Sequence, residues 1–177
     1  GSEMCIRDRS FFVPKPFTPF QWYPMCTKDD FLGRAKIVNE SVKAQLNRKS
    51  MKYNWHEADV TLIEGVLARG DRRLSKVLVH VYEHGGIFDA WSEFFNYDRW
   101  LNAFAETGID PAFYTTRVRE EEELFPWDFI DAGISKSFLL REWHQAQKGV
   151  VTPNCRQQCS GCGASQFQGG VCYENQN

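Results

Sequence analysis

Long apolar runs, a strong net charge and common catalytic signatures are all missing from this sequence of 177 residues. No stretch of about 18 apolar residues occurs and the mean hydropathy is -0.48, so nothing predicts a membrane span. A formal net charge of -2 gives no electrostatic reason to expect a nucleic acid or an anionic membrane as a partner. Internal repeats, a GxxxxGK phosphate loop and a GxSxG nucleophile elbow are also missing.

The pattern of a secretory signal peptide, a basic and then apolar segment, does not open the given sequence. Four of the six cysteines cluster near the C-terminus at the spacing of metal ligands rather than being spread as a disulfide framework. Both features favour a reducing compartment. We therefore expect a cytoplasmic protein.

The composition that is present is that of a folded domain, with 42% hydrophobic and 15% aromatic residues. Apolar residues recur at helical spacing after Thr27, within residues 57–68, after Asp71, after Asn96 and after Ser135, and glycines follow several of these segments. Residues 51–55 (MKYNW) alternate as in a short strand. The sequence predicts a mainly α protein with a few short strands, of the α+β class.

Residues 1–9 (GSEMCIRDR) resemble a translated sequencing adapter, residue for residue through Asp8. We expect them to be foreign to the natural chain, which would make the remainder a C-terminal fragment. The net charge is the same without them, because this segment contains two basic and two acidic residues.

The cysteine tail, residues 151–177, is the strongest chemical signal. Cys155, Cys159 and Cys162 are separated by three and two residues, and Cys172 follows ten positions later. Thiolates at this spacing can converge on one metal, and the glycines among them permit the turns required. Soft sulfur ligands select zinc or an iron–sulfur cluster over magnesium or calcium. We predict a metal site at these four cysteines and leave zinc and iron–sulfur open.

Three further groups are candidates for ligand contacts. The proline-rich loop, which contains Pro14, Pro16 and Pro19, offers Lys15 and Gln21 as donors and Trp22 as a stacking face. The alternative is a loop docked on the core by its rings. The arginine turn holds Arg69, Asp71, Arg72 and Arg73, which could bind a carboxylate or phosphate or form salt bridges with nearby acids. Asp89 and Glu93 could serve as acid and base, in a segment whose rings otherwise indicate packing.

Five segments together resemble the C-terminal region of radical S-adenosylmethionine proteins that carry a cobalamin-binding domain. They are residues 12–22 (FVPKPFTPFQW), 64–73 (EGVLARGDRR), 88–93 (FDAWSE), 126–131 (PWDFID) and 152–163 (TPNCRQQCSGCG). The resemblance implies that residues 10–26 are the last strand and loop of a truncated partial (β/α) barrel. Residues 27–150 would form the C-terminal helical domain, and the cobalamin-binding and radical domains would lie upstream.

The resemblance also implies chemistry. The parent protein would be an iron–sulfur enzyme that cleaves S-adenosylmethionine to a 5′-deoxyadenosyl radical at an upstream [4Fe–4S] cluster, with cobalamin as a further cofactor. Its substrate is not indicated, and this chain alone is expected to be inactive. Two departures are Phe17, where histidine is expected, and the residues between Gly163 and Cys172, where a shorter Cys-Gly-Val-Cys is expected. The alternative is a freestanding zinc-binding module whose arginine turn contacts nucleic acid or an acidic protein.

Overall fold

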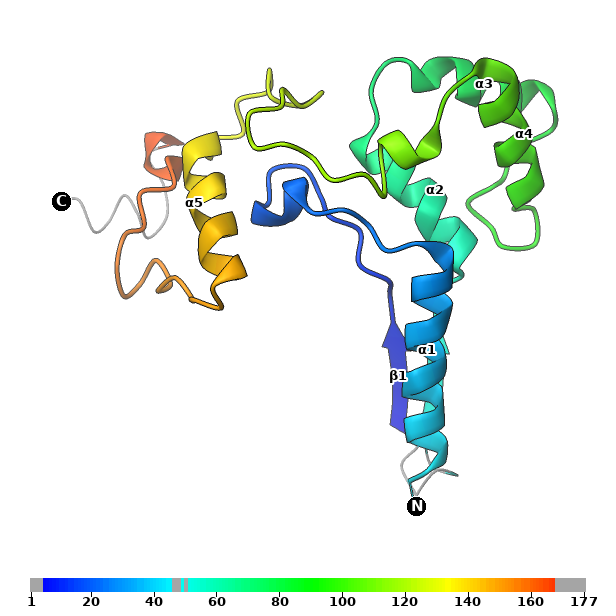
Figure 1. Ribbon diagram of the computed structural model, residues 1–177, viewed down its shortest axis with the longest axis horizontal. Coiled ribbons are helices and arrows are strands. Elements are labelled where there is room, and N and C mark those ends of the chain that lie inside the picture. The colour runs from blue at the N-terminus through cyan, green and yellow to red at the C-terminus, as the bar shows by residue number, and fades with distance from the viewer. Residues whose placement is uncertain (1–4, 46–48, 50, 168–177) are drawn as a thin grey trace. The chain divides into compact units, whose positions relative to one another are not determined.

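The chain forms short helices joined by long loops, as seen in a computed structural model that describes residues 5–45, 49 and 51–167 (Figure 1). Its helices are α1 (Lys28–Lys43), α2 (Ala58–Arg69), α3 (Leu74–Glu83), α4 (Tyr97–Thr107) and α5 (Lys136–Gln147), with the 3-10 turns η1 (Pro19–Trp22), η3 (Pro111–Phe113) and η4 (Ala164–Phe167). The strands are β1 (Cys5–Arg9) and β2 (Met51–Trp55). The predicted mainly helical fold is confirmed.

Helix ends follow local chemistry. At the start of α1, Thr27 and Asp30 form a capping box, in which the Asp30 amide donates to Thr27 Oγ1 at 3.2 Å and the Thr27 amide donates to Asp30 Oδ2 at 3.0 Å. The Asn96 side chain caps α4 by accepting from the Arg99 amide, and the Ser135 side chain caps α5 by accepting from the Phe138 amide. Gly108 ends α4 in the left-handed conformation, with φ at 66°.

The chain divides into two compact units. Unit 1 contains Gly1–Val13 and Pro24–Arg117, and unit 2 contains Pro14–Tyr23 and Val118–Asn177. This division differs from the predicted boundaries at 10–26, 27–150 and 151–177, because the proline-rich loop groups with the C-terminal third of the chain.

Unit 1 is built around α2, α3 and α4, and α3 and α4 lie side by side (Figure 1). Its main core contains Ile63, Val66, Leu74, Val77, Val81, Trp100, Ala103, Phe104 and Tyr114. A second cluster joins Val13, Met25, Phe31 and Ala58. Strands β1 and β2 pair in parallel from Cys5↔Met51 to Arg9↔Trp55, with α1 between them in the chain. The predicted strand at residues 51–55 is confirmed.

The strand expected within residues 10–26 is not formed. Residues 10–16 have no regular structure, and η1 is the element that follows. Pro14 and Pro16 remove two of the amides that a strand ladder would need. Instead the segment is held by side chains, because Val13 is buried beside Met25 and the Phe11 ring stacks on Phe31 with 4.4 Å between centroids.

Unit 2 has its own core where η1 meets α5. Trp22, Phe125, Trp127 and Leu139 are buried there, and Phe17, Phe138, Leu140 and Trp143 pack around them. The aromatic rings contributed by the proline-rich loop therefore hold that loop against the helix.

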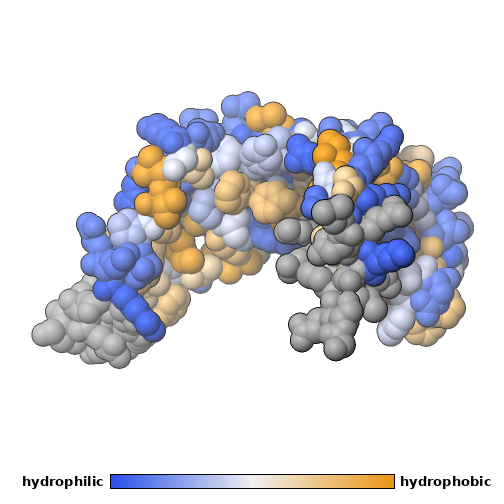
Figure 2. Space-filling view, turned by 90° about the horizontal axis from the view of Figure 1, so that it is seen from below, coloured by the Kyte–Doolittle hydropathy of each residue, from blue (hydrophilic) through white to orange (hydrophobic). Residues whose placement is uncertain are grey.

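Apolar side chains also reach the surface, as Figure 2 shows in orange. Leu124 and Phe129, both in unit 2, are among the most exposed, with 85% and 84% of their surface accessible. In the part of the chain that the structure describes, no helix is both long enough and apolar enough to cross a bilayer.

Candidate functional site

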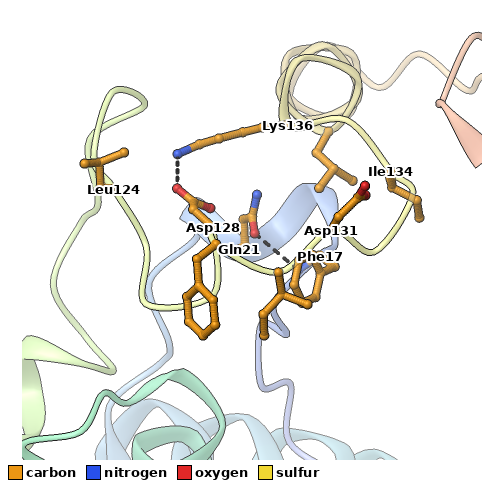
Figure 3. A pocket seen from close by; sticks show the side chains of 10 residues that line it. Phe17, Gln21, Leu124, Asp128, Asp131, Ile134 and Lys136 are labelled. Carbon is orange, nitrogen blue, oxygen red and sulfur yellow. Dashed lines mark hydrogen bonds and ion pairs between the residues drawn. The ribbon is translucent and has the colours of Figure 1, made fainter.

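A pocket in unit 2 is the best candidate for a ligand site (Figure 3). It has a volume of about 420 Å³ and is formed by the proline-rich loop, the segment before α5 and the first turns of that helix. Its lining consists of Phe17, Gln21, Leu124, Asp128, Phe129, Ile130, Asp131, Ile134, Lys136 and Leu139. A few polar groups set in apolar walls are typical of small-molecule sites.

Gln21 joins the two segments that form the pocket. Its side chain is 2% exposed, and its Oε1 accepts from the Trp127 Nε1 at 2.8 Å and from the Phe17 amide at 3.2 Å. The 3-10 turn η1 places it there, with Pro19 at its first position. The glutamine predicted as a ligand contact therefore lies at the pocket, with its carbonyl oxygen committed to holding the wall together.

Phe17 forms part of the wall in a strained conformation. Its φ is 58°, which makes it the one non-glycine residue with positive φ in the described part of the chain. This region costs a residue with a β-carbon roughly 1–2 kcal/mol, and such residues concentrate at functional sites. It is also the position where the resemblance expects histidine. The contact to Gln21 and the neighbouring prolines hold the backbone in this shape.

Three charged side chains line the pocket, Asp128, Asp131 and Lys136. Lys136 Nζ lies 2.6 Å from Asp128 Oδ2 and 2.8 Å from the Glu123 carbonyl oxygen, and Asp128 Oδ2 also accepts from the Phe125 amide at 2.9 Å. Asp131 Oδ1 accepts from the Gly133 amide at 2.8 Å. With two carboxylates and one ammonium group, the charged side chains of the lining carry a formal net negative charge.

The other members of the proline-rich loop lie away from the opening. Trp22 is 2% exposed and packs against Phe125 with 5.8 Å between ring centroids, so its ring is a core element rather than an open stacking face. Lys15 is exposed and does not line the pocket. Of the three residues predicted in this loop, only Gln21 is brought to the site.

The predicted arginine turn lies in unit 1. Arg69 is fully buried and Arg72 is exposed. Arg73 donates to Asp71 Oδ2 from Nε at 3.0 Å and from Nη2 at 2.6 Å. The Tyr114 hydroxyl also donates to Asp71 Oδ1 at 3.1 Å. The Arg73 guanidinium, helped by its backbone amide and by Tyr114, holds the pKa of the Asp71 carboxyl below its ordinary value against the opposing effect of burial.

Asp89 and Glu93 also lie in unit 1 and have different surroundings. Asp89 accepts from Arg99 Nη1 at 2.9 Å and from Trp100 Nε1 at 2.7 Å, which anchors its loop to α4. Glu93 is exposed. Both carboxylate oxygens of Asp89 are therefore engaged in holding this loop.

The cysteine tail has local features that suit a thiolate ligand. The Ala164 amide donates to Cys162 Sγ at 3.5 Å, and Gly161 and Gly163 have φ values of 65° and 102°. Cys155 and Cys159 are exposed. Among the described residues, no three His, Cys, Asp or Glu side chains are gathered closely enough to hold a metal, and Cys172 lies outside the described residues. The four-cysteine site stays a prediction.

Hydrogen bonds nevertheless join the tail around Cys162 to the start and middle of α5. The Cys162 carbonyl oxygen accepts from the Ser135 amide at 2.9 Å, and Arg141 donates to the Ser160 carbonyl oxygen. A β-carbon at Gly163 would lie 3.0 Å from the Gly133 carbonyl oxygen, so the two backbones approach closely there. These contacts fix the turn that carries Cys162.

Comparisons with known proteins identify no relative. No protein-family model, curated protein or solved structure matches this chain. The assignment of the site therefore depends on its own chemistry.

Three polar pocket residues were not among the predicted site residues. Asp128 and Asp131 lie in the segment PWDFID, which the resemblance marked without assigning roles to its residues. Lys136 is in the first turn of α5, where its sequence context indicates only a helix start. No signal in the sequence pairs Lys136 with Asp128, because that contact depends on how the intervening loop folds.

Proposed function

We propose that this chain is the C-terminal part of a radical S-adenosylmethionine iron–sulfur enzyme, and that the unit 2 pocket binds part of its substrate. The observation behind the proposal is that two of the five resemblance segments, residues 12–22 and 126–131, meet at one pocket. Gln21 and Trp127, which are 106 positions apart, are joined there by a hydrogen bond. Segments that contact the same ligand need such a shared surface.

The pocket favours a ligand with an apolar body and one cationic or hydrogen-bond-donating group. Six apolar side chains form most of its lining, which would remove the ligand's hydrocarbon surface from water. Asp131 supplies acceptor oxygens, and the Lys136–Asp128 pair supplies a fixed dipole whose charges already compensate each other. This chain's part is to bind and orient the substrate.

The radical chemistry would come from S-adenosylmethionine and a [4Fe–4S] cluster held by an upstream cysteine motif, with cobalamin as a further cofactor. The resemblance assigns the cluster ligands to that upstream part. The cobalamin-binding and radical domains would therefore be the partners with which this chain acts. We expect no turnover from the chain by itself.

The test is to recover the complete reading frame from its source and produce the whole protein without oxygen. With dithionite as electron donor, we expect S-adenosylmethionine to be cleaved to methionine and 5′-deoxyadenosine. Asp131→Asn should lower turnover of the substrate about tenfold or more, since a charge-assisted hydrogen bond is worth roughly 1.5–3 kcal/mol. The exposed Glu122→Gln is the matched control and should have no effect. A reading frame without an upstream C-x3-C-x2-C motif would refute the proposal.

For the tail, we propose a thiolate metal site at Cys155, Cys159, Cys162 and Cys172. Metal content and visible absorption of anaerobically purified protein, compared with Cys159→Ala, distinguish the two metals. Iron and sulfide with broad absorption near ~400 nm, abolished in the variant, would establish an auxiliary cluster. One zinc per chain in a colourless protein would make the tail a structural clasp. Unchanged metal content in the variant would contradict the site.

A further inference from the structure

Two histidines share one face of α3 at its C-terminal end, in unit 1. His80 and His84 are four positions apart, so helical geometry places their side chains one above the other. Their rings stack, with 4.1 Å between centroids and 11° between planes. The proposed function makes no use of them. This face of α3 therefore presents two imidazole groups at one place.

The hydrogen bonding of these rings selects the nitrogens that can bind a ligand. His84 Nδ1 lies 2.7 Å from the His80 carbonyl oxygen, and a carbonyl oxygen only accepts, so Nδ1 carries the proton. Nε2 of neutral His84 therefore holds the lone pair. His80 Nδ1 is buried and has no hydrogen-bond partner among the described residues, which leaves Nε2 as the solvent-accessible nitrogen of that ring. Metal-binding histidines typically donate their other ring N–H to a backbone carbonyl, as His84 does here.

The separation of the two rings suits a shared metal ion. A metal binds an imidazole nitrogen at about 2.0–2.1 Å, so two nitrogens on one metal lie at most about 4.2 Å apart. Rings whose centroids are 4.1 Å apart need only small side-chain rotations to reach this separation. His84 is also the C-cap of α3, where the negative end of the helix dipole favours a cation.

A histidine at a helix end can also simply cap a carbonyl group, and His84 does so. Capping uses Nδ1 alone, however, and leaves Nε2 available. The nearby cation Arg99 is paired with Asp89 at 2.9 Å, so its charge is compensated. The outer nitrogens of the histidine pair are therefore open to a ligand.

We propose that His80 and His84 bind a divalent transition-metal ion through Nε2 of each ring. Imidazole suits ions such as Zn²⁺, Cu²⁺ and Ni²⁺, whereas Mg²⁺ and Ca²⁺ prefer oxygen ligands. Within the part of the chain that the structure describes, no third His, Cys, Asp or Glu side chain is gathered with the pair, so water completes the coordination. The ion would clip together the last turns of α3, whose Val77 and Val81 belong to the core of unit 1, and so stabilise that unit.

Titration with nickel nitrilotriacetate tests this site, because that chelate leaves two adjacent coordination positions of Ni²⁺ open. The isotope-labelled chain is followed by NMR after the thiols of the cysteine tail have been alkylated, so that they do not compete for nickel. Saturable paramagnetic broadening of the amide resonances of residues 76–86 is expected. His80→Gln and His84→Gln should each weaken the affinity about tenfold or more, since even the loss of a partner of a metal ligand has an effect of that size.

The matched control is His56→Gln, which removes an exposed histidine elsewhere in unit 1 and should leave the affinity unchanged. A second control combines Tyr82→His with His84→Tyr, both at exposed positions. It keeps the composition but separates the histidines by two positions, which do not face each other on a helix, so the affinity should fall to that of the single variants.

Two results would overturn the proposal. One is equal affinity in the parent chain and the Tyr82→His, His84→Tyr variant, and the other is equal weakening by His56→Gln and His84→Gln. Either would mean that nickel only collects at single exposed histidines. Because the test needs neither a cluster nor turnover, and the tail thiols are blocked, its failure is independent of the proposed enzyme function and of the tail site.

Discussion

Replacing Gln21 by leucine is the most informative perturbation of unit 2. The leucine has a similar volume but no acceptor, so the Trp127 Nε1 and the Phe17 amide lose the oxygen that they share. A buried donor left without an acceptor costs roughly 1–3 kcal/mol. Most of this cost falls on Trp127, which is 6% exposed, and less on the half-buried Phe17 amide. We expect unit 2 to lose about 2–3 kcal/mol of local stability.

Native-state hydrogen exchange measured by mass spectrometry reports this loss unit by unit. Peptides from residues 14–23 and 118–139 should exchange roughly 30- to 150-fold faster, while peptides from unit 1 keep their protection. The exposed Gln158→Leu, also in unit 2, is the matched control and should change little. In Gln21→Leu combined with Trp127→Phe, both polar partners are gone, so the destabilisation should be smaller than the sum of the two single effects by about 1 kcal/mol or more.

Two results would contradict this role of Gln21. One is that Gln21→Leu behaves like Gln158→Leu, and the other is that the double variant is strictly additive. Either result would mean that water or another group satisfies Trp127 Nε1 and that Gln21 does not join the two segments. The pocket would then lack the connection on which its assignment depends.

Two further outcomes concern unit 1. The Asp71 pKa lies below its ordinary 3.8, so the contribution of this carboxylate to stability is complete above that value and is lost as the pH falls through the lower folded pKa. Thermal unfolding at pH 2–5 should show this loss of stability in acid, and Asp71→Asn should abolish the Asp71 part of it. Gly108→Ala adds a β-carbon at a residue whose φ is 66°, and no atom lies within 4 Å of that carbon. Backbone strain alone should therefore destabilise unit 1 by roughly 1–2 kcal/mol, and equal denaturation midpoints for Gly108→Ala and the parent chain would contradict this.

Local signals in the sequence predicted local structure well. The Thr27 capping box, the Asn96 and Ser135 caps and the Gly108 stop each involve residues within one helical turn of one another. Their energetics are the same in any protein, so the starts of α1, α4 and α5 and the end of α4 could be assigned without knowledge of the tertiary fold. The start expected from an Asp71 cap was less accurate, because Arg73 is the N-cap of α3 and no side chain caps it.

Burial was predicted less well, because periodicity identifies a single apolar stripe. Helical spacing within residues 57–68 puts Leu67 on the same apolar stripe as Ile63, but Leu67 is 44% exposed, whereas Thr61 and Arg69 are buried at 2% and 0%. Gly65 shows why, since a β-carbon there would lie 2.2 Å from Met25 Sδ. Neighbouring segments cover the polar side of α2, and nothing within α2 reveals that they do.

The pocket was the least predictable feature for the same reason. Its polar groups come from separate loops, and the contact between Gln21 and Trp127 spans 106 positions. The arginine turn shows an intermediate case, because Arg73 was singled out from sequence while the Phe113 ring that it contacts was not. That contact exists only once residues 71–73 and 110–117 of unit 1 have met.

The discontinuity of unit 2 has a consequence for how the protein is made. On a ribosome, residues 14–23 emerge first but must wait for residues 118–139 before Gln21 can meet Trp127. All of Pro24–Arg117 is synthesised in between, and folding of that stretch shortens the loop that has to close. Until then the aromatic rings of the early segment lack their partners. Nascent chains halted before residue 118 should therefore be the ones that chaperones retain.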